Sequence, residues 1–484
     1  AHHPEDRRFF CLRDGGPAPA APRPAPPETI LPAYTCEVRP ARWETVAPAA
    51  GLPVSTPVEI TLAEPAAAKA LQASFAGAGV SAILVPTPSG TAQTVLFTEG
   101  LAVAPMTARH WAALAASRHA RKPGAKLIFL QRLTADTGLE GLSRTLRREW
   151  ADVMTACWTL LDDTPGEVIA GWLGSGSEDL WISPDGTARR AALGPFISPH
   201  AIPPAAPGLW LVTGGARGVT ATCAVEVARQ SGGTFILAGR SAETAWPEGV
   251  AETTEIKALR GLMASAAVQR GEKPSPAAID KAAGAALAGL EIRATLAEIR
   301  STGAEAHYFQ MDTSDPGSVE AALTTIRQRF GAITGLIHGA GVIADRLVEE
   351  KTEAELRRVL ATKAEGLFHI LARIDRTALR HVGLFSSASA FFGNRGQSDY
   401  AMANAILANA GRALQAELPG ARVKVFDWGP WEGGMVDATL ASHFKQQGVP
   451  LIPLAEGARI FAHELLAGDP ADVELVVGTV WSDT

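Results

Sequence analysis

The sequence predicts an α/β fold of two tandem Rossmann-like subdomains, in which a truncated, non-catalytic one precedes a complete, doubly wound parallel sheet. Short apolar runs alternate with helix-like sequence through both halves of the 484-residue chain. Only the second half has a glycine-rich turn directly after its first strand. We assign residues 1–28 to a linker, 29–205 to the first subdomain and 206–484 to the second.

Composition excludes several classes of protein. Hydrophobic residues make up 47% of the chain, enough for a large core, and charged residues only 19%, with a net charge of -6 and no basic face. The four cysteines are widely spaced and form no CxxC pair. The chain has no apolar run of about 18 residues and no signal-peptide core at its start. We therefore expect a cytoplasmic protein without a metal site, a nucleic-acid partner or a membrane span.

The N-terminal part of the chain is predicted to be structural. Residues 13–28 are rich in proline and alanine, which indicates either a semi-rigid tether within a larger polypeptide or a floppy terminus. The first subdomain shows β-α-β order but contains no phosphate-binding loop and no catalytic cluster. We expect strands at 82–86, 94–97 and 127–131, helices at 105–118 and 138–151, and a hairpin in 178–193 around Asp185-Gly186.

A second proline-rich linker, 198–208, precedes the predicted doubly wound sheet. Residues 241–303 are too long for an ordinary crossover, and Gly271 and Pro274 divide them into two helices. We expect this insert to pack at the sheet edge, with Pro276 beginning its second helix. The strands are predicted at 209–215, 234–240, 307–312, 335–341, 382–387, 423–429 and 473–480.

The glycine-rich turn after the first of these strands predicts a dinucleotide site. Glycines let the backbone approach a pyrophosphate, and the following helix N-terminus supplies amide donors. Position 220 is Thr where such folds commonly have a third glycine, so helix and strand must pack slightly differently. The residues of the turn are Thr213, Gly214, Gly215, Ala216, Arg217, Gly218 and Val219.

The residue after the second strand favours NADPH over NADH. An acidic residue there would bind the ribose hydroxyl of NAD, but this chain has Arg240, followed by Ser241. Arg240 can pair with a 2′-phosphate, with Arg217 beside it; the alternative is a solvated surface arginine. Asp312, followed by Thr313, ends the third strand and can accept from the adenine amino group or cap a helix.

Ser387, Tyr400 and Asn404, with Lys363 upstream, predict carbonyl reduction. A phenol is a poor acid at neutral pH, and a nearby ammonium lowers its pKa. The phenol can protonate the carbonyl oxygen of a substrate while hydride reaches the adjacent carbon, and a serine hydroxyl can hold that oxygen in place. Ser386 and Ser389 are neighbouring alternatives, but the spacing of thirteen residues to Tyr400 favours Ser387.

Residues 206–484 resemble the ketoreductase domain of type I polyketide synthases, in the short-chain dehydrogenase superfamily. The motifs that carry the resemblance are TGGARGV, HGAGV, FSSASAFFGNRGQSDYAMANA and DWGPWEGGM. Residues 29–205 resemble the structural subdomain of such synthases through GLEGLSRTLRREW and SPDGTARRAAL. GGARGVTA and the helical insert look closest to polyunsaturated fatty acid synthases and their iterative relatives.

The resemblance implies a role for each matching residue. Tyr400 matches the proton donor and Ser387 the serine that orients the ketone. Simpler relatives have lysine where this chain has Asn404; polyketide ketoreductases exchange the two, and Lys363 stands at the matching place, 37 residues before Tyr400. Lys363 would lower the pKa of Tyr400 and hold the nicotinamide ribose. In HGAGV, Gly339 and Ala340 would pass close to that ribose, with His338 as a buried spacer.

The resemblance also bears on product stereochemistry. Asp345 aligns with the last residue of a motif of one stereochemical class, and Phe392 replaces the tryptophan of the opposite class. Both indicate a D-configured 3-hydroxy product, although Ala344 departs from the motif. Trp431 and Met435, with Trp428 and Pro430, resemble the loop that leads into a substrate lid; for the tryptophans, the alternative is ordinary apolar packing.

The resulting hypothesis is NADPH-dependent reduction of a 3-ketoacyl group to a 3-hydroxyacyl group. The substrate would be linked through phosphopantetheine to acyl carrier protein, a partner together with other domains of a polyketide or polyunsaturated fatty acid synthase. One alternative is a free-standing reductase of small ketones or sugars, against which the proline-rich linkers argue. The other is an inactive scaffold domain, against which the intact catalytic set argues.

Overall fold

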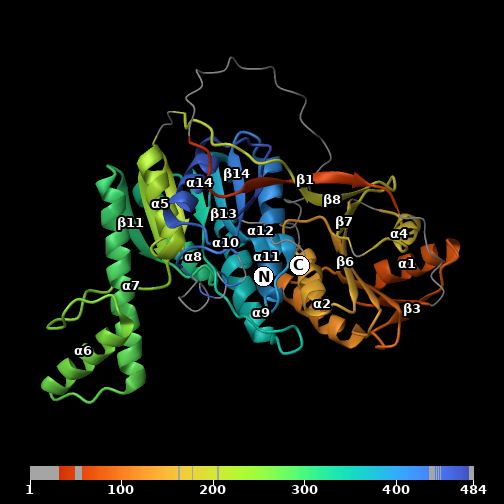
Figure 1. Cartoon of the computed structure of the whole chain (residues 1–484), viewed down its shortest axis with the longest axis horizontal. Coiled ribbons are helices and arrows are strands. Elements are labelled where there is room, and N and C mark those ends of the chain that lie inside the picture. Colours follow the sequence, from red (N-terminus) through yellow and green to blue (C-terminus); the bar gives the residue numbers. More distant parts are fainter. Residues whose placement is uncertain are drawn as a thin grey trace.

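The computed structural model describes residues 32–48, 57–161, 164–176, 178–203, 207–434, 442, 444, 446 and 449–478. Within this part of the chain, strands form one continuous sheet with the order β11-β10-β9-β12-β13-β14-β15-β1-β8-β7-β6-β5-β4-β2-β3 (Figure 1). The strands are β1 (Val38–Val46), β2 (Val58–Thr61), β3 (Ala82–Val85), β4 (Thr94–Gly100), β5 (Lys126–Arg132), β6 (Met154–Leu160), β7 (Leu180–Ile182), β8 (Ala188–Leu193), β9 (Leu209–Thr213), β10 (Thr234–Gly239), β11 (Glu305–Gln310), β12 (Gly335–His338), β13 (His381–Ser387), β14 (Arg422–Trp428) and β15 (Glu474–Val477).

Strand β1 joins the two halves of the sheet. Its first residues pair antiparallel with β15, in the register Val38↔Val477, and the rest pairs antiparallel with β8 as far as Val46↔Ala188. Because β7 is antiparallel to β8 in turn, the parallel strands of the first half run opposite to those of the second. The carboxyl ends of the two sets of strands therefore lie on opposite edges of the sheet.

The two halves share a strand order. The first half reads β3-β2-β4-β5-β6-β7, and the second reads β10-β9-β12-β13-β14-β15 with β11 added outside β10. The expected α/β fold with a large parallel sheet is confirmed. Since the sheet is continuous through β1, its strand order does not by itself set the domain boundaries, which stay predictions.

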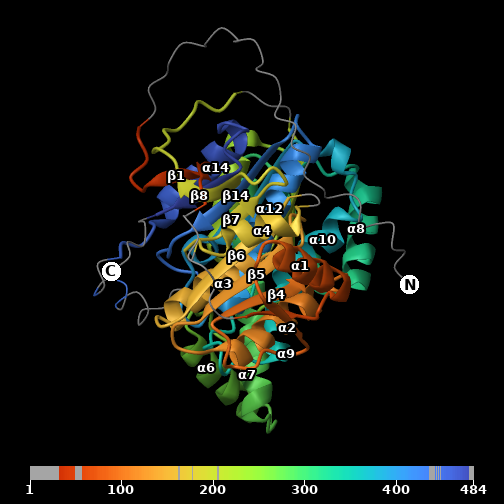
Figure 2. The ribbon, with the colours of Figure 1, turned by 90° about the vertical axis from the view of Figure 1, so that its right-hand side faces the viewer.

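Helices cover both faces of the sheet. Helices α5, α7 and α14 cover one face of the second half and α8, α10 and α12 the other. In the first half, α3 and α1 lie on opposite sides of β4, β5 and β6 (Figure 2). The helices are α1 (Pro65–Gly77), α2 (Met106–Ala120), α3 (Leu139–Glu149), α4 (Gly166–Trp172), α5 (Gly218–Ser231), α6 (Ile256–Gln269), α7 (Pro276–Ser301), α8 (Pro316–Phe330), α9 (Glu353–Leu360), α10 (Gly366–Leu371), α11 (Ala388–Phe392), α12 (Ser398–Glu417) and α14 (Leu454–Ala467), with a π-helix, η2 (Ala361–Glu365), and a 3₁₀ turn, η3 (Arg376–Ala378).

A buried cluster between the halves joins α2 and α3 of the first to α9 and α12 of the second. Leu142 and Leu146 of α3 share this cluster with Met402 and Ile406 of α12. The contact is close because α3 presents glycine: a Cβ built at Gly141 would lie 2.4 Å from the carbonyl carbon of Ala401. Helix α12 of the second half is therefore packed directly on the first half.

The helices expected in the insert are present, but only part of them projects. Helix α6 and the beginning of α7 stand away from the sheet (Figure 1), where Leu259 and Ala283 belong to a small separate cluster. The end of α7 packs on β9 and β10 through Ile292 and Leu296, as an ordinary crossover helix does. The expected pair is thus one crossover helix lengthened at its start, with α6 packed on the extension.

Three strands were not predicted, namely β1, β2 and β6. Strand β1 carries charged residues at several positions and does not form a continuous apolar run. Its pairing partners lie more than a hundred residues away, so no local pattern identifies it. In the described part of the chain, no helix has both the length and the apolar character needed to cross a membrane.

Candidate active site

The glycine-rich turn begins at the carboxyl end of β9. Gly214 has φ 68° and Gly218, the first residue of α5, has φ 62°, which is the left-handed region that glycine adopts without strain. A Cβ at Gly214 would lie 2.8 Å from the carbonyl oxygen of Gly339. No side chain caps the N-terminus of α5, so its amide groups are available to an anion.

Thr220 and Gly339 are complementary in shape. Thr220 occupies the place of the usual third glycine, and a Cβ at Gly339 would lie 2.4 Å from its Oγ1. The glycine that permits close helix packing is therefore found on the β12 side of the contact. The sequence predicted a packing difference at position 220, and the structure shows it as the contact of Thr220 with Gly339.

The residues expected to read the adenosine part lie around the ends of β10 and β11. Arg240 follows β10, is exposed, and has no ion-pair partner among the described residues. Arg217 makes an ion pair of 3.4 Å with Glu291 of α7. Asp312 accepts hydrogen bonds from the backbone and hydroxyl of Ser314, whereas the N-cap of α8 is Asp315. Ser241 uses its carbonyl to accept a bond of 2.5 Å from Tyr308.

A buried histidine holds the segment that carries Lys363. His338 is fully buried, with Nδ1 2.8 Å from Thr213 Oγ1 and Nε2 2.8 Å from the carbonyl oxygen of Lys363. Burial lowers the pKa of His338 to about 4, so the ring is neutral near pH 7. Thr313 donates to the carbonyl oxygen of Thr362 at 3.0 Å. Lys363 thus lies in a π-helical turn, η2, fixed from two strand ends.

Lys363 and Tyr400 are brought together although 37 residues separate them. The Lys363 Nζ lies 5.1 Å from the centroid of the Tyr400 ring, and a Cβ at Gly341 would lie 3.4 Å from the same Nζ. Lys363 is buried and Tyr400 partly buried. Asn404 lies one turn after Tyr400 on α12 and donates from Nδ2 to its carbonyl oxygen at 2.9 Å, while its own buried Oδ1 has no partner in the described structure.

Ser387 ends β13 and caps the short helix α11. Its Oγ accepts from the backbone N–H of Ser389 at 3.2 Å and lies 3.1 Å from the Ser389 hydroxyl. Ser386, the neighbouring alternative, donates to the carbonyl oxygen of Asn404 at 3.3 Å and is buried. Of the two, Ser387 is the more exposed hydroxyl, at the carboxyl end of a central strand, where open α/β sheets bind ligands.

The electrostatics of the pair differ from the expectation that Lys363 lowers the pKa of Tyr400. Burial raises the pKa of Tyr400, and the nearby Asn404 side chain opposes the rise. Burial also lowers the pKa of Lys363 to about 7, with Asp427 opposing the shift. The reason is geometric: Lys363 faces the ring and is itself desolvated, so burial outweighs its attraction for a phenolate.

The predicted stereocontrol residues fall in different surroundings. Asp345 is exposed and accepts from Gln397 Nε2 at 3.0 Å. Phe392 ends α11, with its ring 5.0 Å from that of Phe391. Trp431 is buried in the core with its ring 4.6 Å from Trp428, so ordinary apolar packing describes both tryptophans here. Met435 lies outside the described residues.

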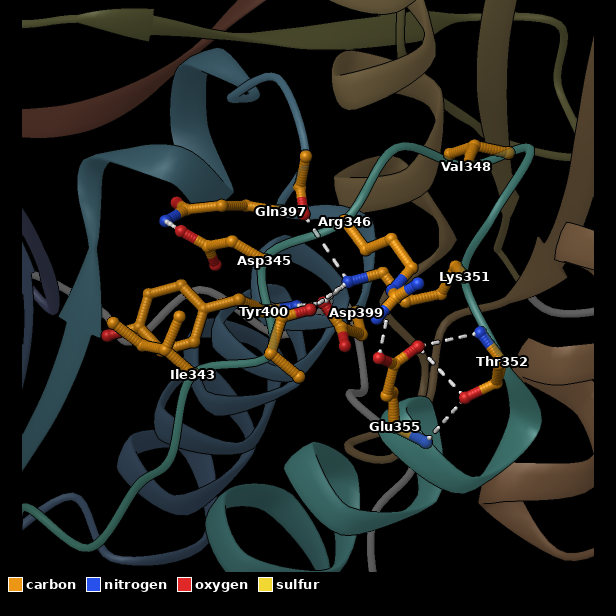
Figure 3. Close-up of polar contacts among 12 residues, drawn as sticks. Ile343, Asp345, Arg346, Val348, Lys351, Thr352, Glu355, Gln397, Asp399 and Tyr400 are labelled. Atoms are coloured by element: carbon orange, nitrogen blue, oxygen red, sulfur yellow. Dashed lines mark hydrogen bonds and ion pairs between the residues drawn. The ribbon is translucent and has the colours of Figure 1, made fainter.

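A buried ion pair beside Tyr400 was not predicted from the sequence. Lys351 Nζ lies 2.9 Å from Asp399 Oδ1, with both side chains fully buried (Figure 3). Asp399 Oδ1 also accepts the backbone N–H of Tyr400 at 2.8 Å. The sequence contains a local signal only for the position of Lys351, because the capping box formed by Thr352 and Glu355 begins α9 directly after it.

The comparisons with known proteins agree with this geometry. The model of the KR domain family matches residues 208–433. A polyunsaturated fatty acid synthase protein from Thraustochytrium sp. is 39% identical over 271 residues, which cover 54% of this chain and 10% of that protein. Polyketide synthase PksL of Bacillus subtilis is 31% identical over 272 residues, covering 54% of this chain and 5% of that protein. The chain thus matches only a small part of each relative.

Solved structures share the fold over nearly the whole chain. A ketoreductase domain from the bacillaene assembly line has a TM-score of 0.64 at 20% identity, covering 92% of this chain and 97% of that one. The structure of an A1-type ketoreductase has a TM-score of 0.68 at 20% identity, covering 92% and 93%. At such identity the likeness establishes the architecture, including the half that the family model does not reach.

Proposed function

Residues 208–433 of this chain are a ketoreductase domain of the type I polyketide synthase family, and on that premise we propose that the chain reduces 3-ketoacyl thioesters with NADPH. The observation that carries the proposal is the meeting of Lys363 with Tyr400 next to the glycine-rich turn. Two residues distant in sequence converge where a dinucleotide fold binds its ligand.

The residues present fit NADPH. The turn at Gly214 and Gly215 has no room for side chains, since a Cβ at Gly215 would lie 2.1 Å from Val212 Cγ1. The uncapped N-terminus of α5 suits the pyrophosphate, and the exposed Arg240 suits a 2′-phosphate. When bound, NADPH supplies the hydride for the keto carbon.

Tyr400 donates the proton that the ketone oxygen takes up. Its raised pKa keeps the phenol protonated near neutral pH, and Ser387 shares the task of holding the oxygen. A group with a pKa of about 7 exchanges protons readily near neutral pH, so Lys363 is suited to return a proton to Tyr400. Asn404, whose Oδ1 is free in the described structure, supports this relay.

We further propose that the ketone is presented on acyl carrier protein within a larger synthase. The relatives named above are many times longer than the matching region, and this chain contains proline-rich segments of the kind that tether domains. Asp345 and Phe392 favour a D-configured 3-hydroxy product.

The test is a product assay with chiral analysis. The purified chain should oxidise NADPH when given a 3-ketoacyl thioester on acyl carrier protein, and should turn over free small ketones more slowly. Tyr400→Phe should lower kcat by about 10²-fold or more while NADPH still binds. Tyr34→Phe, which removes a hydroxyl bonded to Glu464, is the matched control and should keep full turnover. Full activity in Tyr400→Phe would refute the proton donor.

A further inference from the structure

We propose that Glu149, in the half of the chain without catalytic residues, is a positioning residue of the reductase site. Together with the buried Lys351–Asp399 pair, its carboxylate fixes the two backbone segments that flank Tyr400. The inference rests on the proposed function, because it assigns a role in that reaction.

Glu149 spans from one half of the molecule to two loops of the other. It is the last residue of α3, and its Oε2 accepts the backbone N–H of Val348 at 2.8 Å. Its Oε1 accepts the backbone N–H of Gly396 at 2.9 Å. Val348 lies in the segment between β12 and α9 that carries Asp345, and Gly396 lies in the turn that leads into α12. One carboxylate thus sets the spacing of two segments that are not adjacent in sequence.

Lys351 ties the same two segments from inside. Its Nζ donates to the carbonyl oxygens of Ala344 and of Gly396, the latter at 3.3 Å, and to Asp399 Oδ1 at 2.9 Å. Figure 3 shows the Lys351 and Asp399 side chains meeting between the loop that carries Asp345 and the start of α12. Since Asp399 also accepts the N–H of Tyr400, the tie ends on the backbone of the proton donor itself.

The charges of the tie depend on one another. Burial raises the pKa of Glu149 and that of Asp399, and in both cases the charge of Lys351 opposes the rise. Lys351 is the ion-pair partner of Asp399, whereas the backbone N–H groups of Val348 and Gly396 are the main groups that oppose the rise at Glu149. A buried charge that loses its partner is strongly unfavourable, so the three groups hold one arrangement together.

The location of these contacts indicates that they position the groups around Tyr400 in addition to stabilising the interface between the halves. Gln397, next to Gly396, donates to Asp345, so both segments held by Glu149 meet again at a predicted stereocontrol residue. Displacement of a catalytic group by about 1 Å can cost about 10² in rate. Arg118 of α2 also donates to the carbonyl oxygen of Val348 at 2.7 Å, which adds a second contact from the same half.

The experiment compares Glu149→Gln with Glu140→Gln. Glu140 lies on the same helix, is buried where Glu149 is half-buried, and accepts from Asn409 of α12 at 2.8 Å, but within the described residues it makes no hydrogen bond to the loops around Tyr400. For Glu149→Gln we expect kcat to fall about tenfold, KM for NADPH to stay within about twofold, and the ratio of the two 3-hydroxy stereoisomers to change. Glu140→Gln should keep kcat and the stereoisomer ratio whatever its stability.

Hydrogen exchange gives a readout that does not need turnover. In Glu149→Gln the amides of Val348 and Gly396 should lose protection, whereas in Glu140→Gln they should keep it. Equal kcat, stereoisomer ratio and protection in the two variants would overturn the inference. If the wild-type chain reduces no thioester, the proposed function fails, and the exchange comparison alone still decides whether Glu149 holds the two loops.

Discussion

The two halves of the molecule share one strand order but differ at the carboxyl edge of their strands. At the carboxyl edge of the second half, β9 and β12 run into glycines and α5 begins at Gly218 without a side-chain cap. At the corresponding edge of the first half, Thr61 donates to Glu99 at 2.9 Å. There the N-cap residue of α1, Glu64, donates its N–H to Thr98, and the next residue is Pro65, which has no N–H.

The difference shows what makes such an edge a site. In the first half, Thr98 accepts the N–H of Glu64 and Pro65 has no N–H to offer, and among the described residues no strand corresponds to β11. In the second half, glycines stand at 214, 215 and 218, and no side chain caps the amide donors of α5. The proposed cofactor site therefore depends on the glycines and uncapped amide groups at the strand ends as much as on the scaffold, which both halves possess.

The sharpest test of the contrast exchanges a buried lysine in each half for methionine. Lys363→Met should lower kcat by about 10²-fold or more, because it removes the group suited to return the proton to Tyr400. Lys126 is also buried, with a pKa lowered to about 8 by burial, and it donates to the carbonyl oxygens of Leu173 and Ser175. Lys126→Met should lower the melting temperature and leave kcat unchanged.

The same lysine predicts a pH dependence. The pKa of Lys363 is lowered to about 7, so the ammonium form that supplies a proton disappears as pH rises through that value. Turnover of the wild-type chain should fall on the alkaline side of about pH 7. The residual turnover of Lys363→Met should lack this decline, and a decline at the same pH in that variant would assign it to another group.

A smaller effect concerns the cofactor. Arg240→Ala should weaken NADPH binding by about tenfold, through loss of one charge-assisted contact to the phosphate, and leave NADH binding unchanged. Arg132, an exposed arginine at the end of β5 in the first half, is the control. Arg132→Ala should change neither affinity by calorimetry. Equal weakening of both cofactors by Arg240→Ala would contradict the assignment.

The contact between the halves predicts an effect on stability. Gly141→Ala places a Cβ against the backbone of Ala401 and should lower the free energy of unfolding by about 1–3 kcal/mol. Gly171, on α4 of the same half, has no atom within 4 Å of its Cβ position. Gly171→Ala should be neutral or stabilising by up to about 1 kcal/mol in denaturant titrations.

The smallest effect is expected at Glu99, at the carboxyl edge of the first half. Burial raises the pKa of Glu99, so its contribution to stability is present at low pH and lost as pH rises through the folded value. Glu99→Gln should remove this loss and raise stability at pH 7 by less than about 1 kcal/mol, without changing kcat. A fall in kcat would mean that the first-half edge takes part in the reaction.

The sequence was sufficient where the placement of residues depends on local pattern. Tyr400 and Asn404 are one helical turn apart, and the glycine-rich turn follows an obvious strand, so these positions could be predicted. The surroundings of charged residues could not be predicted: Glu149 and Lys351 lie in polar stretches, and only tertiary packing leaves Glu149 half-buried and Lys351 buried. The π-helical setting of Lys363 likewise comes from distant contacts, those of His338 and Thr313.

Strand β1 has a consequence for any shortened form of this protein. It covers the outer edge of β15, and the pairing at Val38↔Val477 is what keeps that edge from presenting free backbone groups. A polypeptide beginning at residue 206 would retain every predicted catalytic and cofactor residue but expose β15. Unprotected strand edges recruit one another, so such a fragment should self-associate and precipitate even though its chemistry is intact.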